Sequence, residues 1–360
     1  MTRTLLHVFA TFKVGGPQIR FARVANHFGR RWRHLVVAMD GNTEARERLD
    51  PGLDVEFPEI AIRRGRTLPN LMPFRRALKA WRPDLLVTSN WGSIDWALAN
   101  LDGLVPHLHM EDGFGPEEAL RQLPRRVWTR RLALRRSTVL LPSMTLQRIA
   151  RTEWKLPARR ILYVPNGVDC ARFVAMPPET TGGAMAGPVV GTVAVLRPEK
   201  NLKRLLEAFA LVARERPARL EIVGDGPERA ALEAYASDLG VAGRVTFAGN
   251  RSDPERALAG FSVFALSSDT EQMPLSVLEA MAAGRPLVAT DVGDVRRMVA
   301  QENHPFVVPK DARMLAGALR TLLDRPGMAA EIGAANARRA REVYDQELMF
   351  SAFAKLFDRT

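Results

Sequence analysis

The chain has 360 residues, 46% of them apolar and 26% charged, a composition typical of a soluble globular protein long enough for about two domains. Its single cysteine, Cys170, excludes an intramolecular disulfide framework and a zinc site built from cysteines, and it favours a reducing cytoplasm. The first apolar run, residues 5–10, is too short for a signal peptide, and no run reaches the roughly 18 apolar residues of a membrane span.

The net charge of +12 is unevenly placed. Residues 1–165 contain 28 Lys and Arg against 15 Asp and Glu, whereas the remainder contains 24 against 25. The densest part, residues 121–136, is expected to be a helix whose arginines project all around the axis, which weakens the case for a membrane-lying amphipathic helix. A solvated basic surface and contact with an anionic membrane or acceptor both stay open. Nucleic acid is not expected, because few aromatic residues are interleaved there.

Short β-like runs alternate with helical patterns from end to end, which predicts an α/β protein with parallel sheets. In the first half, strands are expected at residues 4–10, 34–39, 85–88, 105–110, 138–141 and 161–164. The series then restarts with strands at residues 189–196, 219–223, 244–248, 263–266, 286–290 and 305–308.

The segment between the two series, residues 173–188, is rich in Pro, Gly and Thr and has no periodicity, so it is expected to be a linker. The predicted domains are therefore residues 1–172 and 189–344, followed by a final helix over residues 345–360. Two such units facing each other across a cleft would bind ligands beyond the carboxyl ends of their strands.

Gly15 and Gly16 follow the first strand and open a helix, where backbone amides could approach a phosphate. A plain turn is the alternative for this pair. The chain has neither a GxGxxG fingerprint after the strand nor a GxxxxGK[ST] phosphate loop, which argues against NAD enzymes and P-loop NTPases.

Arg197 and Lys200 follow the first strand of the second series, where they could neutralise a diphosphate or simply be surface cations. Gly224 lies in a turn after the next strand, and it could admit a nucleotide or serve the turn alone. No two aspartates are spaced as DxD, so a site that needs no metal is favoured, with side chains and helix ends supplying the positive field.

The run His107-Leu108-His109-Met110-Glu111-Asp112 ends a strand of the first half and precedes a glycine-rich loop. Alternation sends His107, His109 and Glu111 to one side of the strand. These side chains could supply a proton acceptor or a charge stabiliser. A structural role and metal binding by the two histidines also stay open.

The stretch TEQMPLSVLEAMAAG, residues 270–284, predicts a helix over residues 274–283, with Pro274 in its first turn and Gly284 after its end. Glu279 falls on the predicted buried stripe among Leu275, Leu278 and Ala282. A buried carboxylate needs hydrogen-bond donors, and sugar hydroxyl groups could supply them, while the helix entrance suits a phosphate. The alternative is that Glu279 reaches solvent and that Glu271 merely complements the helix dipole.

Together these motifs resemble the retaining glycosyltransferases of family 4, which have the GT-B fold of two Rossmann-like domains. The resemblance covers nearly the whole chain. It rests on GGPQ (15–18), VPNGVD (164–169), RPEKN (197–201), VGDGPE (223–228) and TEQMPLSVLEAMAAGRPLVATDVGD (270–294). The last block, with two glutamates eight positions apart, is the most specific of the five.

The resemblance implies that the C-terminal domain binds a nucleotide-diphosphate sugar and that the N-terminal domain binds the acceptor. Glu279 would hold the ribose hydroxyl groups, Glu271 the donor sugar, and Lys200 the leaving diphosphate. The predicted donor-binding residues are Gly15, Gly16, Arg197, Lys200, Gly224, Glu271, Met273, Pro274, Leu275 and Glu279. The reaction would retain the anomeric configuration, by same-face attack that the departing phosphate assists. The final helix would cross back onto the N-terminal domain.

Two positions depart from the family pattern. Many relatives have arginine where this chain has Val195, so Arg197 is a candidate for the phosphate contact. Many also have histidine where this chain has Asp112, so the first-half catalytic group is open among Asp112, Glu111 and His109, alongside Lys200 and Glu271 in the second half.

The resulting prediction is a cytoplasmic glycosyltransferase that needs neither metal nor cofactor and uses a nucleotide sugar. It would act on a glycan or lipid-linked acceptor in surface polysaccharide or glycolipid assembly, with peripheral contact to the inner face of an anionic membrane. The alternatives are a nucleotide-sugar epimerase and a non-enzymatic basic protein that binds membranes or nucleic acid.

Overall fold

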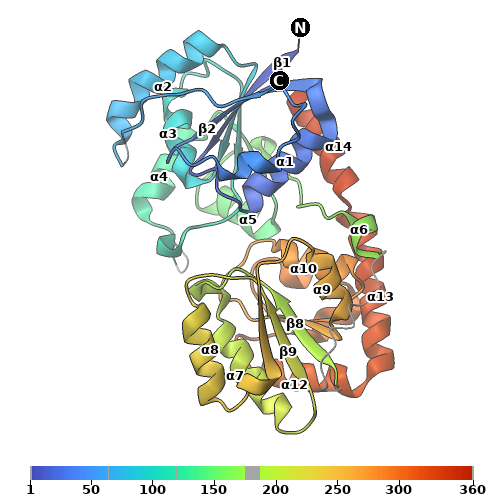
Figure 1. Cartoon of the computed structure of the whole chain (residues 1–360). Coiled ribbons are helices and arrows are strands. Elements are labelled where there is room, and N and C mark those ends of the chain that lie inside the picture. Colours follow the sequence, from blue (N-terminus) through green and yellow to red (C-terminus); the bar gives the residue numbers. More distant parts are fainter. Residues whose placement is uncertain (1, 64, 119–120, 175–186, 359–360) are drawn as a thin grey trace. The chain divides into compact units, whose positions relative to one another are not determined.

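The computed structural model describes residues 2–63, 65–118, 121–174 and 187–358. The chain divides into two compact units, Met1–Asn166 with Met349–Thr360, and Gly167–Leu348. Each unit is a parallel sheet with helices on both faces (Figure 1), as the sequence predicts. Within the described ranges, none of the helices combines the length and apolar composition needed to cross a membrane.

The sheet of the first unit has seven parallel strands in the order β3-β2-β1-β4-β5-β6-β7. The strands are β1 (Arg3–Phe9), β2 (Trp32–Ala38), β3 (Val55–Glu56), β4 (Leu85–Ser89), β5 (His107–Met110), β6 (Thr138–Leu141) and β7 (Ile161–Tyr163). The sequence predicts six of these strands but not β3. Its two residues pair with His34 and Leu35, too short a run to produce a periodic pattern.

Helices cover both faces of this sheet. They are α1 (Gly16–Phe28), α2 (Thr67–Trp81), α3 (Ile94–Ala99), α4 (Pro124–Ala133), α5 (Met144–Thr152) and α14 (Gln346–Asp358). Leu6 of β1 belongs to a buried cluster with α2 and α3, whereas its neighbour Leu5 belongs to one with α1 and α14. This alternation explains why the strands are apolar on both sides.

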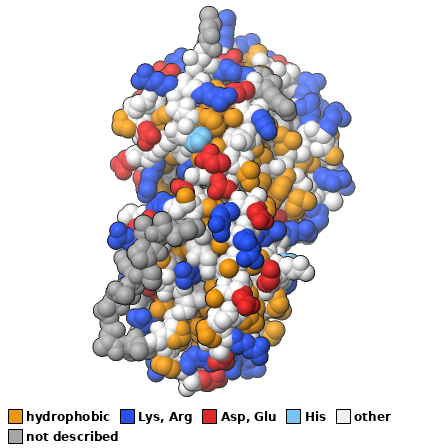
Figure 2. All heavy atoms as spheres, turned by 90° about the vertical axis from the view of Figure 1, so that its right-hand side faces the viewer, with side chains coloured by type: hydrophobic (Ala, Val, Ile, Leu, Met, Phe, Trp, Pro, Cys, Tyr) orange, Lys and Arg blue, Asp and Glu red, His pale blue; other side chains and the backbone are white. Residues whose placement is uncertain are grey.

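The final helix, α14, belongs to the first unit from Met349 onward. Phe350, Phe353 and Phe357 join the buried cluster that contains Trp32. The indole Nε1 of Trp32 also donates a hydrogen bond of 3.0 Å to Asp358 Oδ1. Figure 2 views the molecule from the side of α14, where basic and acidic side chains are mixed with hydrophobic ones.

The sheet of the second unit has six parallel strands in the order β10-β9-β8-β11-β12-β13, and the sequence predicts all six. The strands are β8 (Val189–Val193), β9 (Arg219–Val223), β10 (Val245–Gly249), β11 (Val263–Leu266), β12 (Leu287–Thr290) and β13 (Val307–Val308). The helices are α6 (Cys170–Val174), α7 (Leu202–Ala213), α8 (Arg229–Asp238), α9 (Pro254–Gly260), α10 (Leu275–Ala282), α11 (Val295–Met298), α12 (Ala312–Asp324) and α13 (Pro326–Val343).

The division between the units differs from the predicted boundary at residue 172 and the predicted linker over residues 173–188. The chain enters the second unit at Gly167, because Val168, Cys170 and Phe173 are buried in a core cluster of that unit. The first residues of the predicted linker segment belong to α6. Most of that segment, residues 175–186, lies outside the described residues.

Candidate functional site

The loops that follow β8 and β11 hold the candidate donor residues Arg197, Lys200 and Glu271 of the second unit. These two strands are neighbours, and the strand order reverses between them, so their loops diverge at the carboxyl edge of the sheet. Open α/β sheets bind ligands at such a point.

Hydrogen bonds join these two loops. The Asp269 amide donates to the Glu199 carbonyl at 2.8 Å, and Ser267 Oγ donates to the Lys200 carbonyl at 3.0 Å. Asn201 adopts the left-handed conformation at φ 42°, which Asn tolerates better than most residues, and its Nδ2 donates to Asp269 Oδ2 at 3.0 Å. The turn that carries Lys200 is thereby fixed against the loop that carries Glu271.

Lys200 and Glu271 form an ion pair at this edge. Lys200 Nζ lies 2.6 Å from Glu271 Oε1, which also accepts a hydrogen bond of 2.7 Å from Ser268 Oγ. The Lys200 side chain is 24% exposed and that of Glu271 is 10% exposed. Ser268 thus fixes Glu271, and both side chains of the pair remain partly exposed to a ligand.

A second loop, which no sequence pattern singled out, supports Glu271. Gly293 has φ +54°, and a Cβ there would lie 2.3 Å from the Glu271 carbonyl oxygen. The Asp294 amide donates to the Gln272 carbonyl at 3.0 Å. Both residues lie in the block TDVGD, and its Gly-Asp pair is the feature of the sequence that could have indicated this turn.

The helix α10 begins one residue later than expected, with Pro274 at the N-cap, and Gly284 follows its end at φ +67°. The N-cap residue Pro274 makes no side-chain capping hydrogen bond, so the leading amides of the helix can face a ligand. Met273 and Pro274 are buried and Leu275 is half-buried.

Glu279 does not lie on the fully buried stripe that the sequence predicts. Leu278 and Ala282 are buried, but Glu279 and Leu275 are half-buried. The buried face of α10 runs through Val277, Leu278 and Met281 instead, and Glu279 lies at its margin. A carboxylate at this position keeps part of its hydration.

The other two donor candidates of this unit have different surroundings. Arg197 is 59% exposed, with its NH1 3.9 Å from Glu199 Oε1. Gly224 has φ +132°, and a Cβ there would lie 1.9 Å from the Ala194 carbonyl oxygen. The backbone of the β8 loop therefore requires this glycine, whether or not a ligand binds.

In the first unit, Gly15 and Gly16 connect β1 to α1. A Cβ on Gly15 would lie 2.9 Å from Gln18 Oε1, whereas nothing lies within 4 Å of the Cβ position of Gly16. The space beside Gly16 is open.

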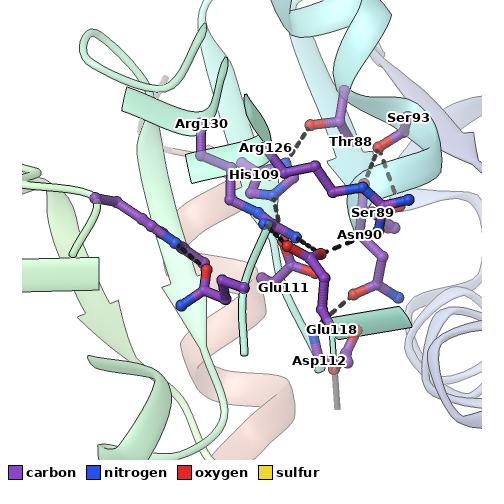
Figure 3. A network of polar contacts seen from close by, with 12 residues as sticks. Thr88, Ser89, Asn90, Ser93, His109, Glu111, Asp112, Glu118, Arg126 and Arg130 are labelled. Atoms are coloured by element: carbon purple, nitrogen blue, oxygen red, sulfur yellow. Dashed lines mark hydrogen bonds and ion pairs between the residues drawn. The ribbon is translucent and has the colours of Figure 1, made fainter. Parts of the chain in front are cut away.

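The three first-half catalytic candidates differ in access (Figure 3). His109 and Glu111 are fully buried, with His109 Nε2 3.5 Å from Glu111 Oε2, and Asp112 is 17% exposed. Thr88 Oγ1 contacts both His109 Nδ1, at 2.8 Å, and His107 Nε2, at 2.7 Å. Both histidines are therefore engaged in a network between β4 and β5.

Arg130, which no sequence motif marks, is the partner of Glu111. Its Nε lies 3.3 Å from Glu111 Oε2, and its NH2 lies 3.1 Å from Glu118 Oε2. Arg130 is fully buried, with its guanidinium about 5 Å from the rings of Trp91, Phe114 and Trp154. The carboxylates of Glu111 and Glu118 thus share Arg130 as a buried cation.

Asp112 is paired with Arg20 of α1. The guanidinium binds both carboxylate oxygens, with Arg20 NH2 2.8 Å from Asp112 Oδ2, and NH1 also donates to Asn166 Oδ1 at 2.9 Å. The Asp112 amide donates to Asn90 Oδ1 at 2.7 Å. Arg20 thus joins three segments that the sequence motifs identify, GGPQ, the Asp112 loop and VPNGVD.

Among the residues described, no group of three or more His, Cys, Asp or Glu side chains could hold a metal ion. His107 and His109 share Thr88, as above, and burial together with the His109 charge lowers the pKa of His107 to about 3.

Comparisons with known proteins agree with this architecture. Residues 14–172 match the family model Glycosyltransferase Family 4, and residues 187–325 match the model Glycosyl transferases group 1. The lipopolysaccharide core biosynthesis glycosyltransferase LpsE of Rhizobium meliloti (strain 1021) is 36% identical over 40% of this chain and 41% of its own length. The 2-deoxystreptamine N-acetyl-D-glucosaminyltransferase of Streptomyces fradiae is 28% identical over 82% of this chain and 79% of its own length.

Among solved structures, HepE of Anabaena in complex with UDP has a TM-score of 0.84 at 21% identity and covers 100% of both chains. This likeness concerns the fold. The matched part of LpsE is less than half of that protein. The two family models together cover most of the chain, so the chain belongs to glycosyltransferase family 4, and it has the GT-B fold.

Proposed function

We propose that the chain transfers a sugar from a nucleotide-diphosphate sugar to a glycan or lipid-linked acceptor with retention of anomeric configuration and without a metal ion. The setting is the assembly of surface polysaccharide or glycolipid at the cytoplasmic side of a membrane. The observation that carries the proposal is the ion pair of Lys200 and Glu271, where the strand order of the second unit reverses.

The roles of the residues follow from their charge and position. Lys200 is the cation that balances the leaving diphosphate, and the uncapped first turn of α10 offers amides to the same group. Glu271, fixed by Ser268, accepts hydrogen bonds from the donor sugar, and Glu279 binds the ribose. Arg197 and Gly16 are additional contacts of the donor.

The acceptor attacks the face of the sugar that the diphosphate leaves, and the departing phosphate oxygen takes the acceptor proton. This step needs no protein nucleophile. Asp112 is the first-half residue proposed to contact the reacting groups, because it is partly exposed while His109 and Glu111 are fully buried. Since Arg20 holds both of its oxygens, its role is to orient a hydroxyl group or to stabilise charge.

Two variants test the donor site. Lys200→Ala and Glu279→Ala are each expected to reduce transfer from the nucleotide sugar by about 100-fold or more, since each removes a charged contact to the donor. The matched control is Lys203→Ala, because Lys203 is an exposed lysine three residues away.

The donor is identified first, by the rise in Tm that each member of a nucleotide-sugar panel produces. Normal transfer by Lys200→Ala or Glu279→Ala, with Tm unchanged, contradicts the site. Conversion of the donor to an epimer when no acceptor is present contradicts the reaction.

A further inference from the structure

The helix α4 is amphipathic in the structure, although its sequence places arginines all around the axis. Arg126 and Arg130 point inward, and they pair with Glu117, Glu118 and Glu111. Their charges are therefore neutralised inside the unit. The cations that remain on the surface of α4 belong to its outward face.

The outward face of α4 presents a tryptophan among arginines. Arg125, Trp128 and Leu132 are spaced i, i+3 and i+7, so they lie on one stripe. Trp128 is 67% exposed and Leu132 is 47% exposed. The guanidinium carbon of Arg131 lies 4.8 Å from the Trp128 ring, and Arg131 Nε donates to the Glu153 carbonyl at 2.8 Å. The indole is thus held in place on the surface.

A groove of about 400 Å³ runs beside this stripe. Its cationic lining consists of Arg121, Arg131 and Lys155, and Trp128 forms part of its wall. The carboxylate of the groove, Glu153, accepts a hydrogen bond of 2.6 Å from Gln122 Nε2. Three cations against one carboxylate suit an anionic group such as a phosphate.

A second stripe of the same kind lies on α2. Leu68 is 80% exposed and Met72 is 59% exposed, and Arg76 and Lys79 continue the stripe toward the end of the helix. The helix contains no acidic residue, and its remaining cation, Arg75, pairs with Asp102 at 2.6 Å.

These two helices belong to the same layer of the first unit. Both α2 and α4 pack against α3, on the sheet face opposite to α1 and α14 (Figure 1). A surface that combines Leu, Met and Trp side chains with several Lys and Arg is the composition that binds the interface of an anionic bilayer. A nucleic acid or another soluble polyanion would pair with the cations but would not bury the exposed leucine and methionine side chains.

We propose that the outward faces of α2 and α4 dock on an anionic lipid bilayer, with Trp128 and Leu132 entering the interface and the groove receiving a lipid phosphate. This surface is the one that contacts the membrane in the function proposed above, and the inference rests on that function. Lipid binding itself requires neither donor nor acceptor, so the two can fail separately.

The test uses the full chain and vesicles of phosphatidylglycerol and phosphatidylcholine, with pure phosphatidylcholine as the neutral reference. We expect sedimentation with the anionic vesicles that weakens at high salt. Trp128→Ser combined with Leu132→Ser is expected to weaken binding about tenfold or more, and Arg125→Gln with Arg121→Gln to weaken it about fivefold for each charge removed.

Matched control variants come from the second unit, where Met314 is 49% exposed beside the exposed Arg313. Met314→Ser and Arg313→Gln should leave vesicle binding unchanged. Lipids with brominated chains should quench tryptophan fluorescence of the native chain, and Trp128→Phe should abolish that quenching. An unchanged Tm shows that a variant that has lost vesicle binding is still folded.

Three results overturn the proposal. They are failure to bind anionic vesicles at low salt, binding that the Trp128 and Leu132 double variant retains, and equal loss of heparin binding in that double variant. Vesicle binding that fails while nucleotide-sugar binding persists defeats the docking surface alone. Vesicle binding that persists in a chain without transfer activity defeats the proposed reaction alone.

Discussion

Arg130 shows how a single buried charge can hold the loop that follows β5. Burial alone raises the pKa of Glu118, but hydrogen bonds and charge from Arg130 and Arg126 bring it below its ordinary value. Arg130→Met leaves Glu111 and Glu118 without their buried cation. We expect the free energy of unfolding to fall by about 3–5 kcal/mol, measured by urea denaturation at pH 7.

The matched control for this prediction is Arg125→Met on the same helix, because Arg125 is exposed. The control should change the free energy of unfolding little. Equal stability of the two variants would show that the buried charges contribute nothing. The loss in Arg130→Met should also shrink below pH 4.5, since protonated Glu118 no longer needs a cation.

The sequence identifies individual residues where a motif carries them and misses those whose partners are distant in the chain. Lys200 and Glu271 were each identified by a motif, and the structure shows that they form an ion pair. Arg20 and Arg130 look like ordinary helix arginines, because nothing local reveals that Asp112 and Glu111 are their partners. Long-range pairing of charges has no periodic signal in sequence.

At the scale of elements, the glycine after β12 controls the position of the Glu271 loop. A Cβ at Gly293 would meet the backbone of Glu271 at 2.3 Å, so Gly293→Ala must displace that loop. We expect the dissociation constant for the donor nucleotide to rise at least about tenfold, because both Glu271 and the start of α10 move. Calorimetric titration with the nucleotide identified in the panel measures the change.

Gly240→Ala is the matched control for Gly293→Ala. Gly240 also has a positive φ, +72° against +54°, but nothing lies within 4 Å of its Cβ position. Both variants therefore carry a left-handed alanine, which costs each about 1–2 kcal/mol of stability. Nucleotide binding that is equally weak in both would attribute the effect to stability rather than to the Glu271 loop.

Elements were predictable where burial is regular along the chain. Parallel strands covered on both faces are continuous apolar runs, which is why twelve of the thirteen described strands could be placed in advance. The helix α10 was placed correctly, but the exposure of Glu279 was not, because the direction of its buried face depends on neighbours that the pattern does not show.

At the scale of the whole molecule, the two units were predictable from the restart of the strand series, but their exact boundary was not. The chain changes unit at Asn166, where no change in composition occurs, because the short helix α6 packs into the second core. Enrichment in Pro, Gly and Thr indicates a segment without regular secondary structure, and such segments occur within domains as well as between them.

The two units should differ in their response to acid. Burial lowers the pKa of His34 to about 4. Burial together with the His34 charge also holds the pKa of His7 well below its ordinary value, with His7 Nε2 3.1 Å from His34 Nδ1. His107, at a pKa of about 3, is in the same unit. In the unfolded chain these groups take up protons near pH 6.5, so the unfolded state binds more protons between pH 6.5 and 4.

The stability of the first unit is therefore complete above pH 6.5 and falls as the pH approaches 4, with His34 alone accounting for on the order of 3 kcal/mol. All six tryptophans lie between residues 32 and 154, so tryptophan fluorescence reports this unit. Between pH 7.5 and 5, its urea midpoint should drop, while hydrogen exchange of residues 189–344 changes less. His34→Gln should flatten the pH dependence of this urea midpoint, whereas His304→Gln, in the second unit, should not change it. An equal loss of stability in both units would refute the assignment to buried histidines.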